Sequence, residues 1–286
     1  MTSDNVLNIL NDALEKDPVA MMAQNLRLDP EDPYKKPKFG GQDKTLNDFC
    51  TGKVHETAHK LYCKEEHDIL NEITLFIDKS HLDVKGKHTL EPVCFTMGIF
   101  NEKFRTKPAA WRPMGYLPNM GHVAPHASAD ERQEDYHHCL RIIMSELVEC
   151  QRLGGIDWTL SFGPEKIYPC RFQIPVNCCI GDTVGHDQLL GKKTNYSGSG
   201  KGGPCRVCDV PHHLLGFPFY GDKVTKPKEK DPNSKPTTMN LTDCKKVRNL
   251  RSNPTLVNKE ELKAMGYKLK HDGMVDVHFS DPRYAL

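Results

Sequence analysis

Two carboxylates stand where the sequence could hold divalent metal ions. Asp78 ends the apolar run "ITLFID" (residues 73–78), and Asp182 ends a later run, "IYPCRFQIPVNCCIGD" (residues 167–182). An ionised carboxylate beside an apolar interior is costly unless it is paired or bound to metal. Two such acids that converge could hold two ions roughly 4 Å apart, which would activate a nucleophile and stabilise the leaving oxygen of a phosphodiester. Magnesium, or manganese in its place, suits such oxygen ligands.

Other residues near these acids leave alternatives open. Asp187, five positions after Asp182, is a further candidate in "GDTVGHDQLLG". Acids at strand ends are also common because strands end in turns and turns favour Asp, and Asp83 is expected in such a turn. His81 and His186 flank the two acids and could instead serve an unrelated metallohydrolase.

A cysteine pair supplies a second type of candidate metal ligand. Cys205 and Cys208 in "PCRVCDVPHH" have the spacing of a zinc knuckle, with His212 and His213 close behind. A redox pair would be expected between a strand and a helix, whereas this pair follows a glycine-rich loop, so structural zinc is the favoured interpretation and inert thiols the next. Candidates for the remaining ligands are His212 or His213 as the third, and Cys244, Cys178 or Cys179 as the fourth.

The elements around Asp78 are predicted to be strands and one long helix. After "ITLFID", the runs "LEPVCFTMGIF" (residues 90–100) and "AAWRPMGYLP" (residues 109–118) predict a three-strand antiparallel meander. Residues 128–155 predict a helix, because Ser128 and Glu131 match a capping box, an apolar stripe follows, and a glycine pair ends it. Asp182 ends the last apolar run after this helix.

A meander, a helix and a further strand, with an acid ending the first and the last strand, are typical of an RNase H-like nuclease. In that fold the first strand is central and the strand after the helix runs parallel beside it, so both acids reach one edge of the sheet. The predicted class is α/β, with an RNase H-like core over residues 71–190. A helical region with a Pro/Gly linker precedes it (residues 1–70), and a loop-rich, cysteine-containing insertion follows (residues 191–286).

Two shorter predictions concern the first region. Residues 4–28 are expected to form a helix because their apolar residues recur near helical spacing, and a second, short helix is expected around "VHETAHKLY" (residues 54–62). The proline- and glycine-containing stretch that begins at Asp29 is expected to be a loop.

Composition narrows the classes of protein. The net charge of the 286-residue chain is +1, so any DNA binding would use local basic patches. The eleven cysteines are odd in number and irregularly spaced, and no secretory signal begins the chain, which favours a nuclear or cytoplasmic location. No run approaches the roughly 20 apolar residues of a membrane span, so no membrane partner is expected.

The ordered set "FIDKSHLDVKGKHTLEPVCFTMGIFN", "AAWRPMGYLPN", "CCIGDTVGHDQLLG" and "CRVCDVP" resembles the Plavaka-type transposases of the Kyakuja-Dileera-Zisupton group, over roughly residues 55–215. The resemblance implies an RNase H-like core with three acidic metal ligands that cuts and joins DNA at transposon ends. By position, Asp78 matches the first acid and Asp182 the second. Cys205 and Cys208 match the cysteine pair of an insertion between the second and third acids.

The resemblance also implies a long helical segment that brings the third acid after the cysteine insertion. Asp276 and Asp281 are the plausible late acids here, and neither lies in a helical pattern. The sequence therefore favours a truncated or domesticated copy, in which the catalytic role is open. The alternative is a non-catalytic, zinc-stabilised module that binds DNA or protein. The N-terminal helices are where DNA-binding or dimerising parts, and hence a homo-oligomer, would be expected.

Overall fold

The structure is a computed structural model that describes residues 22–36, 52–81, 89–181, 189, 255, 260 and 277–280. Residue contacts divide the chain into two compact units, and the strands, together with the long helix from Asp135 onward, belong to the first unit. In chain order the elements are η2 (Ala23–Asn25), α2 (Lys53–Tyr62), β1 (Asp68–Leu70), β2 (Ile73–Ile77), β3 (Ser80–His81), β4 (Thr89–Met97), α3 (Glu102–Arg105), η4 (Pro108–Ala110), β5 (Arg112–Pro118), α4 (Met120–Val123), α5 (Ala129–Arg152), β6 (Ile156–Ser161), β7 (Ile167–Gln173) and β8 (Val176–Ile180).

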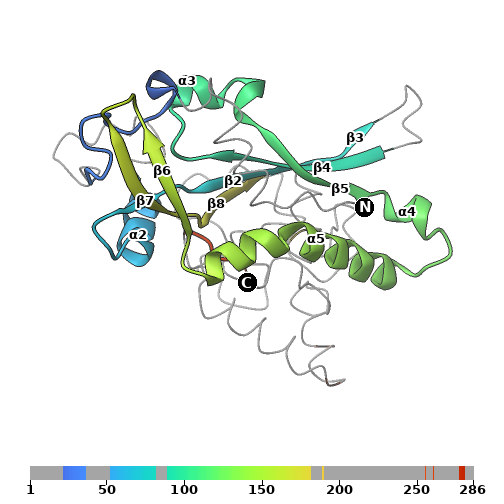
Figure 1. Ribbon diagram of the computed structural model, residues 1–286. Coiled ribbons are helices and arrows are strands. Elements are labelled where there is room, and N and C mark those ends of the chain that lie inside the picture. Colours follow the sequence, from blue (N-terminus) through green and yellow to red (C-terminus); the bar gives the residue numbers. More distant parts are fainter. Residues whose placement is uncertain are drawn as a thin grey trace, which may run out of the picture. The chain divides into compact units, whose positions relative to one another are not determined.

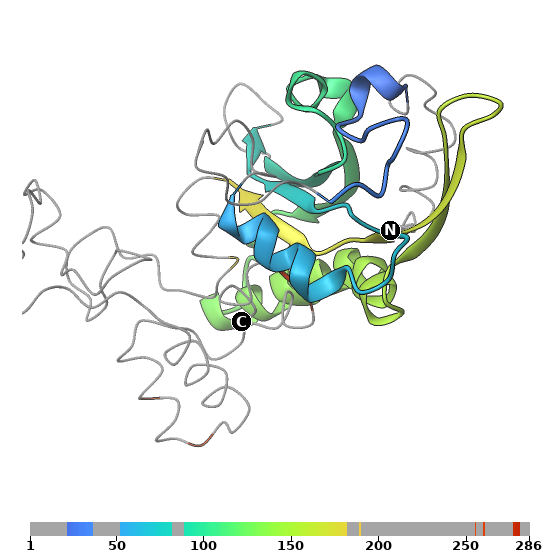
Figure 2. The same cartoon turned by 90° about the vertical axis from the view of Figure 1, so that its left-hand side faces the viewer.

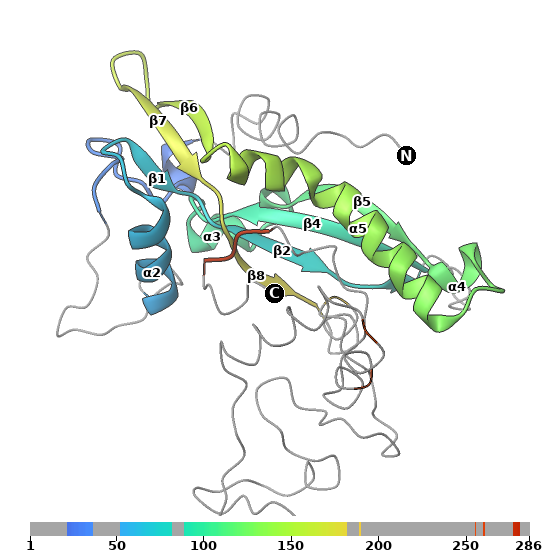
Figure 3. The same ribbon diagram turned by 90° about the horizontal axis from the view of Figure 1, so that it is seen from below.

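The larger sheet contains the predicted meander (Figure 1). β2 pairs antiparallel with β4, and β4 pairs antiparallel with β5, so the prediction of three antiparallel strands is confirmed. The strand that pairs parallel with β2 is β8, which comes after α5 as predicted, but β6 and β7 lie between the helix and this strand. β2 therefore lies between β4 and β8, and the C-terminal ends of β2 and β8 run side by side (Figure 3).

β2 stops at Ile77 because of a proline on the neighbouring strand. β2 and β3 pair with β4 in one continuous register, in which Asp78 lies opposite Pro92. The amide of Gly98 donates to the carbonyl of Glu72 (N···O 2.7 Å), and hydrogen-bonded pairs alternate along an antiparallel ladder, so Asp78 and Pro92 occupy a hydrogen-bonding position. Proline has no N–H to donate. The ladder therefore opens at Asp78.

One face of the larger sheet packs against α5 (Figures 1 and 3). The helix begins with the predicted capping box, in which the Glu131 amide donates to Ser128 Oγ (3.2 Å) and the Ser128 amide donates to Glu131 Oε2 (2.7 Å). Ile143 packs closely over Gly115 of β5, where an added Cβ would lie 3.0 Å from Ile143 Cγ1. Buried side chains of the helix include Tyr136, Leu140, Met144 and Leu147. Those of the sheet include Ile73, Leu75, Ile77, Val93, Phe95 and Met97.

A smaller sheet continues the central pair of strands. β1 pairs parallel with β7, and β7 pairs antiparallel with β6, so that the hairpin of β6 and β7 extends beyond the larger sheet (Figure 2). Backbone hydrogen bonds join the two sheets, because the Asn71 amide donates to the Gln173 carbonyl and the Ile73 amide to the Pro175 carbonyl (both 2.8 Å). The apolar run 167–182 thus contains two strands rather than one, and Pro175 lies between them.

The N-terminal region differs in part from the prediction. The short helix is confirmed as α2. The helix expected over residues 4–28 is wrong at its C-terminal end, because residues 22–28 contain only one turn of 3-10 helix, at Ala23–Asn25. Leu26 instead forms an isolated bridge with Phe100 and is buried, so tertiary contact overrides the helical spacing there. Residues 1–21 lie outside the described part of the chain. Within the described residues, no helix combines the length and apolar character needed to cross a membrane.

Candidate functional site

Asp78 lies at the C-terminal end of β2, on the face of the sheet that α5 does not cover. Ile77 is buried on the α5 side, and side chains alternate along a strand, so Phe76 points to the opposite face. There its ring meets Trp111 edge-to-face, with ring centroids 6.3 Å apart. Asp78 follows two positions later and is half-buried. Among the residues that the structure describes, its carboxylate has no hydrogen-bonding or ion-pairing partner.

The strand pairing required to bring the two predicted acids together is present. Phe76 pairs with Ile180 at the end of the parallel ladder between β2 and β8. Asp78 follows Phe76 by two positions, and Asp182 follows Ile180 by two positions. Asp182 itself lies outside the described residues, so the distance between the two carboxylates stays a prediction. The other predicted site residues outside the described part are Asp187, His186, Cys205, Cys208, His212, His213, Asp276 and Asp281.

The surroundings of Asp78 suit a metal ligand as far as they are described. Carboxylate oxygens are the ligands that magnesium prefers, and the side chain of Asp78 is half-buried and engaged by none of the described residues. Within residues 22–36, 52–81, 89–181 and the short described stretches beyond, no three His, Cys, Asp or Glu residues gather closely enough to hold a metal ion. A metal site at Asp78 would therefore need ligands from residues outside this described part.

Cys170 and Cys179 have the properties of packing residues. Cys178 and Cys179 are adjacent in β8 and pair with Thr74 and Leu75, so their side chains point to opposite faces of the sheet. Burial raises the pKa of the Cys179 thiol to about 12, and it raises that of Cys170 to about the same value. A thiol must lose its proton to attack or to bind metal, so these cysteines are poor nucleophiles and poor ligands near neutral pH.

Residues 277–280 return to the sheet and lie beside β8, which the sequence did not predict. The Val176 amide donates to the His278 carbonyl, and the Ser280 amide donates to the Val176 carbonyl (both 2.8 Å). Gln151 of α5 holds the same segment, since its amide nitrogen donates to the His278 carbonyl (3.1 Å) and its oxygen accepts from the His278 amide (2.8 Å). The segment bridges in parallel to Val176 through Phe279, on the side of β8 away from β2.

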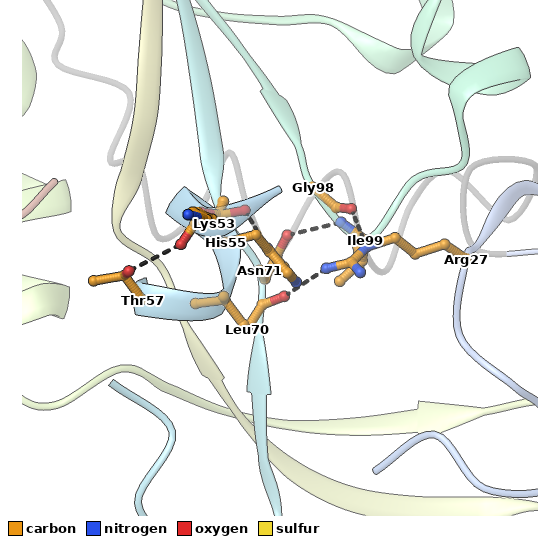
Figure 4. Close-up of polar contacts among 9 residues, drawn as sticks. Arg27, Lys53, His55, Thr57, Leu70, Asn71, Gly98 and Ile99 are labelled. Atoms are coloured by element: carbon orange, nitrogen blue, oxygen red, sulfur yellow. Dashed lines mark hydrogen bonds and ion pairs between the residues drawn. The ribbon is translucent and has the colours of Figure 1, made fainter. Parts of the chain in front are cut away.

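A buried polar cluster at the opposite end of β2 also escaped the sequence analysis (Figure 4). His55 Nδ1 of α2 lies 2.5 Å from Glu72 Oε2, and the two side chains are only 1% and 0% exposed. Asn71 Oδ1 accepts from the Ile99 amide (3.3 Å). The Arg27 guanidinium spans the junction by donating to the carbonyl of Gly98 (2.5 Å) and to that of Leu70 (3.2 Å). These contacts tie α2 and the N-terminal segment to the start of β2, which is a structural role.

A sequence model described as Plavaka transposase matches residues 12–167, which is more than half of the chain. The matched range contains α2, the meander with Asp78, and α5. It starts earlier than the motifs quoted above and ends before Asp182 and the cysteine pair, so the match does not reach those residues. A search among curated proteins found no match for the chain.

Proposed function

Because this chain belongs to the Plavaka transposase family, we propose that its larger sheet is an RNase H-like core that cuts and joins DNA by divalent-metal-dependent chemistry. The strand order supports this proposal. β5, β4, β2 and β8 lie in that order across the sheet, and residues 277–280 add a further parallel segment beyond β8. The central strand therefore carries Asp78, as an RNase H-like site requires.

The observation that carries the proposal is the parallel pairing of β2 with β8. Parallel strands present their C-terminal ends at one edge of a sheet, and an acid follows each end after the same number of residues. Asp78 and Asp182 would thus hold magnesium or manganese, with Asp187 as the candidate third ligand. The ions would lower the pKa of a bound water and stabilise the leaving oxygen of the phosphodiester.

The local structure fixes the position of Asp78. Pro92 denies it a partner amide on β4, so the backbone separates from the ladder at this residue. The contact of Phe76 with Trp111 fixes the strand two residues before Asp78, on the same face of the sheet. A side chain that is half-buried on an anchored backbone needs little reordering to bind a metal ion, which favours a ligand role over that of a turn residue.

We further propose a structural zinc ion at Cys205 and Cys208, with His212 or His213 as the third ligand. Two thiolates at this spacing can bind one tetrahedral ion from a tight turn. The zinc would stabilise the segment between β8 and residues 277–280. A DNA substrate also implies that the protein works in the nucleus.

The test is cleavage of supercoiled plasmid DNA by the purified chain, measured with magnesium, with manganese and with EDTA. We expect metal-dependent nicking that Asp78→Asn and Asp182→Asn each reduce by a factor of the order of 10² to 10³, as for loss of a group that stabilises charge in the transition state. Asp157→Asn is the matched control, because that acid is exposed and paired with Arg171 on the smaller sheet.

Two results would overturn the catalytic proposal. The first is nicking by Asp78→Asn at the rate of the parent chain. The second is a parent chain that binds DNA but does not nick it with either metal. That second result would favour a non-catalytic module, in which binding would be insensitive to Asp78→Asn and lost on Cys205→Ser.

A further inference from the structure

The connection between β4 and β5 concentrates positive charge on one side of the larger sheet. Residues 101–112, "NEKFRTKPAAWR", contain Lys103, Arg105, Lys107 and Arg112 against the single acid Glu102. They form α3, η4 and the start of β5. α3 lies on the face of the sheet opposite to α5, as the views in Figures 1 and 3 agree. We call residues 101–112 the basic connection.

The backbone of the basic connection is held in place by its own side chains. Asn101 caps α3, since its Oδ1 accepts from the Phe104 amide (3.0 Å). The buried ring of Phe104 packs edge-to-face on Phe100, with centroids 5.0 Å apart. The indole nitrogen of Trp111 donates to the Arg105 carbonyl (2.9 Å) and so closes the segment. The cationic side chains therefore project from a fixed frame.

The lysines of this segment differ from many other cations of the molecule in having no acidic partner. Lys103 and Lys107 are exposed, and among the described residues neither forms an ion pair. The cations that do pair with a carboxylate elsewhere are Lys35, Lys60, Arg152, Lys166 and Arg171. A group of like charges without counter-charges is the electrostatic footprint of an anionic partner.

The basic connection adjoins the face that carries Asp78. Trp111 contacts Phe76, which precedes Asp78 by two positions on β2. Burial raises the pKa of the Cys178 thiol of β8, and the positive charge of Arg105 is one of the groups that oppose this rise. Cys178 pairs with Thr74 on the same face of the sheet. The connection follows the end of β4 that pairs with the start of β2, since Met97 pairs with Ile73, so the cations lie on the side of the sheet that carries Asp78 but toward the other end of the strand.

We propose that the basic connection binds the phosphate backbone of a double-stranded DNA that extends along the Asp78 face, away from the bond that is cut. This inference rests on the proposed function, since that function makes DNA the polyanion at this face. Lys103 and Lys107 would act as point charges on phosphates and would carry no sequence preference. Each phosphate contact releases condensed counterions, so the affinity must fall as the salt concentration rises.

The experiment measures the Kd of a labelled duplex by fluorescence anisotropy over a range of salt concentrations, in EDTA so that no cleavage occurs. We expect Lys103→Ala/Lys107→Ala to bind about tenfold more weakly or worse at 0.1 M salt, and to lower the slope of log K against log salt by about 1.8, the value for two contacts. Lys103→Arg/Lys107→Arg keeps both charges and must keep the slope.

The matched control is Lys35→Ala/Lys166→Ala, which removes the same charge from two ion-paired lysines and should leave the slope unchanged. Asp78→Asn separates this inference from the proposed function, because it should abolish nicking while the Kd stays the same or improves. An unchanged slope in Lys103→Ala/Lys107→Ala would overturn the inference even if nicking is confirmed. Binding of labelled poly-glutamate, an acidic polypeptide, is measured in the same way. If Lys103→Ala/Lys107→Ala lost poly-glutamate binding but bound DNA like the parent chain, the inference would be overturned and this surface would be assigned to an acidic protein.

Discussion

The two ends of β2 present carboxylates in opposite situations. Just before the strand, Glu72 is fully buried and its carboxylate contacts His55. Just after it, Asp78 is half-buried and has no partner among the described residues. A buried carboxylate is tolerated only when it is committed to a partner, whereas an accessible one is free to take a ligand. The comparison therefore assigns stability to the start of β2 and agrees with the proposal that chemistry takes place at its end.

The largest expected effect separates these two ends directly. Glu72→Ala should lower the free energy of unfolding by about 3 kcal/mol, because it leaves the buried His55 without its carboxylate. Asp78→Ala should change it by no more than about 0.5 kcal/mol, as for a residue without structural contacts. Urea unfolding followed by circular dichroism measures both.

A control for the first prediction lies on the same helix as His55. Glu56→Ala removes a carboxylate that pairs with Lys60 one turn away at the surface, and such pairs contribute about 0.3–0.5 kcal/mol. If Glu72→Ala proved no more harmful than Glu56→Ala, the buried pair would not stabilise the start of β2, and the contrast between the two ends would collapse.

The end of β2 was more predictable from the sequence than its start. The alternation of Ile73, Leu75 and Ile77 and the capping box at Ser128 are local patterns, and they correctly predicted the meander and the long helix. The opening of the ladder at Asp78 has a visible cause in Pro92, but that cause emerges only from the strand register. Local pattern thus identified the acid, and long-range pairing explains its setting.

The contacts that the sequence analysis missed join residues far apart in the chain. His55 and Glu72 are 17 positions apart and share no periodic pattern. Gln151 and His278 are 127 positions apart, and a glutamine in an amphipathic helix gives no signal that it will hold a distant segment. Such partners are selected by tertiary packing, so one sequence without its fold does not reveal them. The only sequence feature that hinted at the buried pair was His55 itself, a histidine in the predicted short helix.

The second prediction asks whether residues 277–280, which lie beside the first residue of β8, also depend on a polar anchor. Gln151→Ala removes the side chain that bonds both the amide and the carbonyl of His278, and it also loses a bond to the Ile174 carbonyl (2.9 Å). We expect a loss of about 2 kcal/mol, because the Ile174 carbonyl and the His278 amide each lose the hydrogen bond that Gln151 provides. Hydrogen exchange at the His278 amide should become fast.

Its control is the neighbouring substitution Arg152→Ala, which breaks an exposed pair with Glu149 and should leave the exchange at His278 unchanged. Protection of the His278 amide in Gln151→Ala would mean that residues 277–280 are held by β8 alone. The buried pair of Glu72 and His55 would then remain as the polar anchor at this end of the sheet.

The third prediction concerns the carboxylate of Glu91, which has a hydrogen-bonding partner and stands on β4, the strand next to β2. Glu91 of β4 is buried on the α5 face, and its Oε1 accepts from the Tyr136 hydroxyl (2.7 Å). Tyr136→Phe should cost about 1–2 kcal/mol, because a buried carboxylate loses a hydrogen bond. Tyr116→Phe, at an exposed tyrosine of β5, should cost almost nothing. Equal unfolding curves for the two variants would show that Glu91 does not need α5.

The smallest effect is expected from a carboxylate that is exposed yet has a partner. The amide of Ser128 donates to Glu131, and together with the Ser128 hydroxyl this holds the pKa of that carboxyl below its ordinary value of 4.5. A lowered pKa in the folded state stabilises the protein above the ordinary value, and the benefit is lost as the pH falls through the lowered one. Glu131→Gln should therefore melt slightly below the parent chain at pH 7 and together with it at pH 3. Ser128→Ala removes the hydroxyl but keeps the amide, so its stability should still fall in acid; a flat profile would mean that the hydroxyl, rather than the amide, sets the pKa.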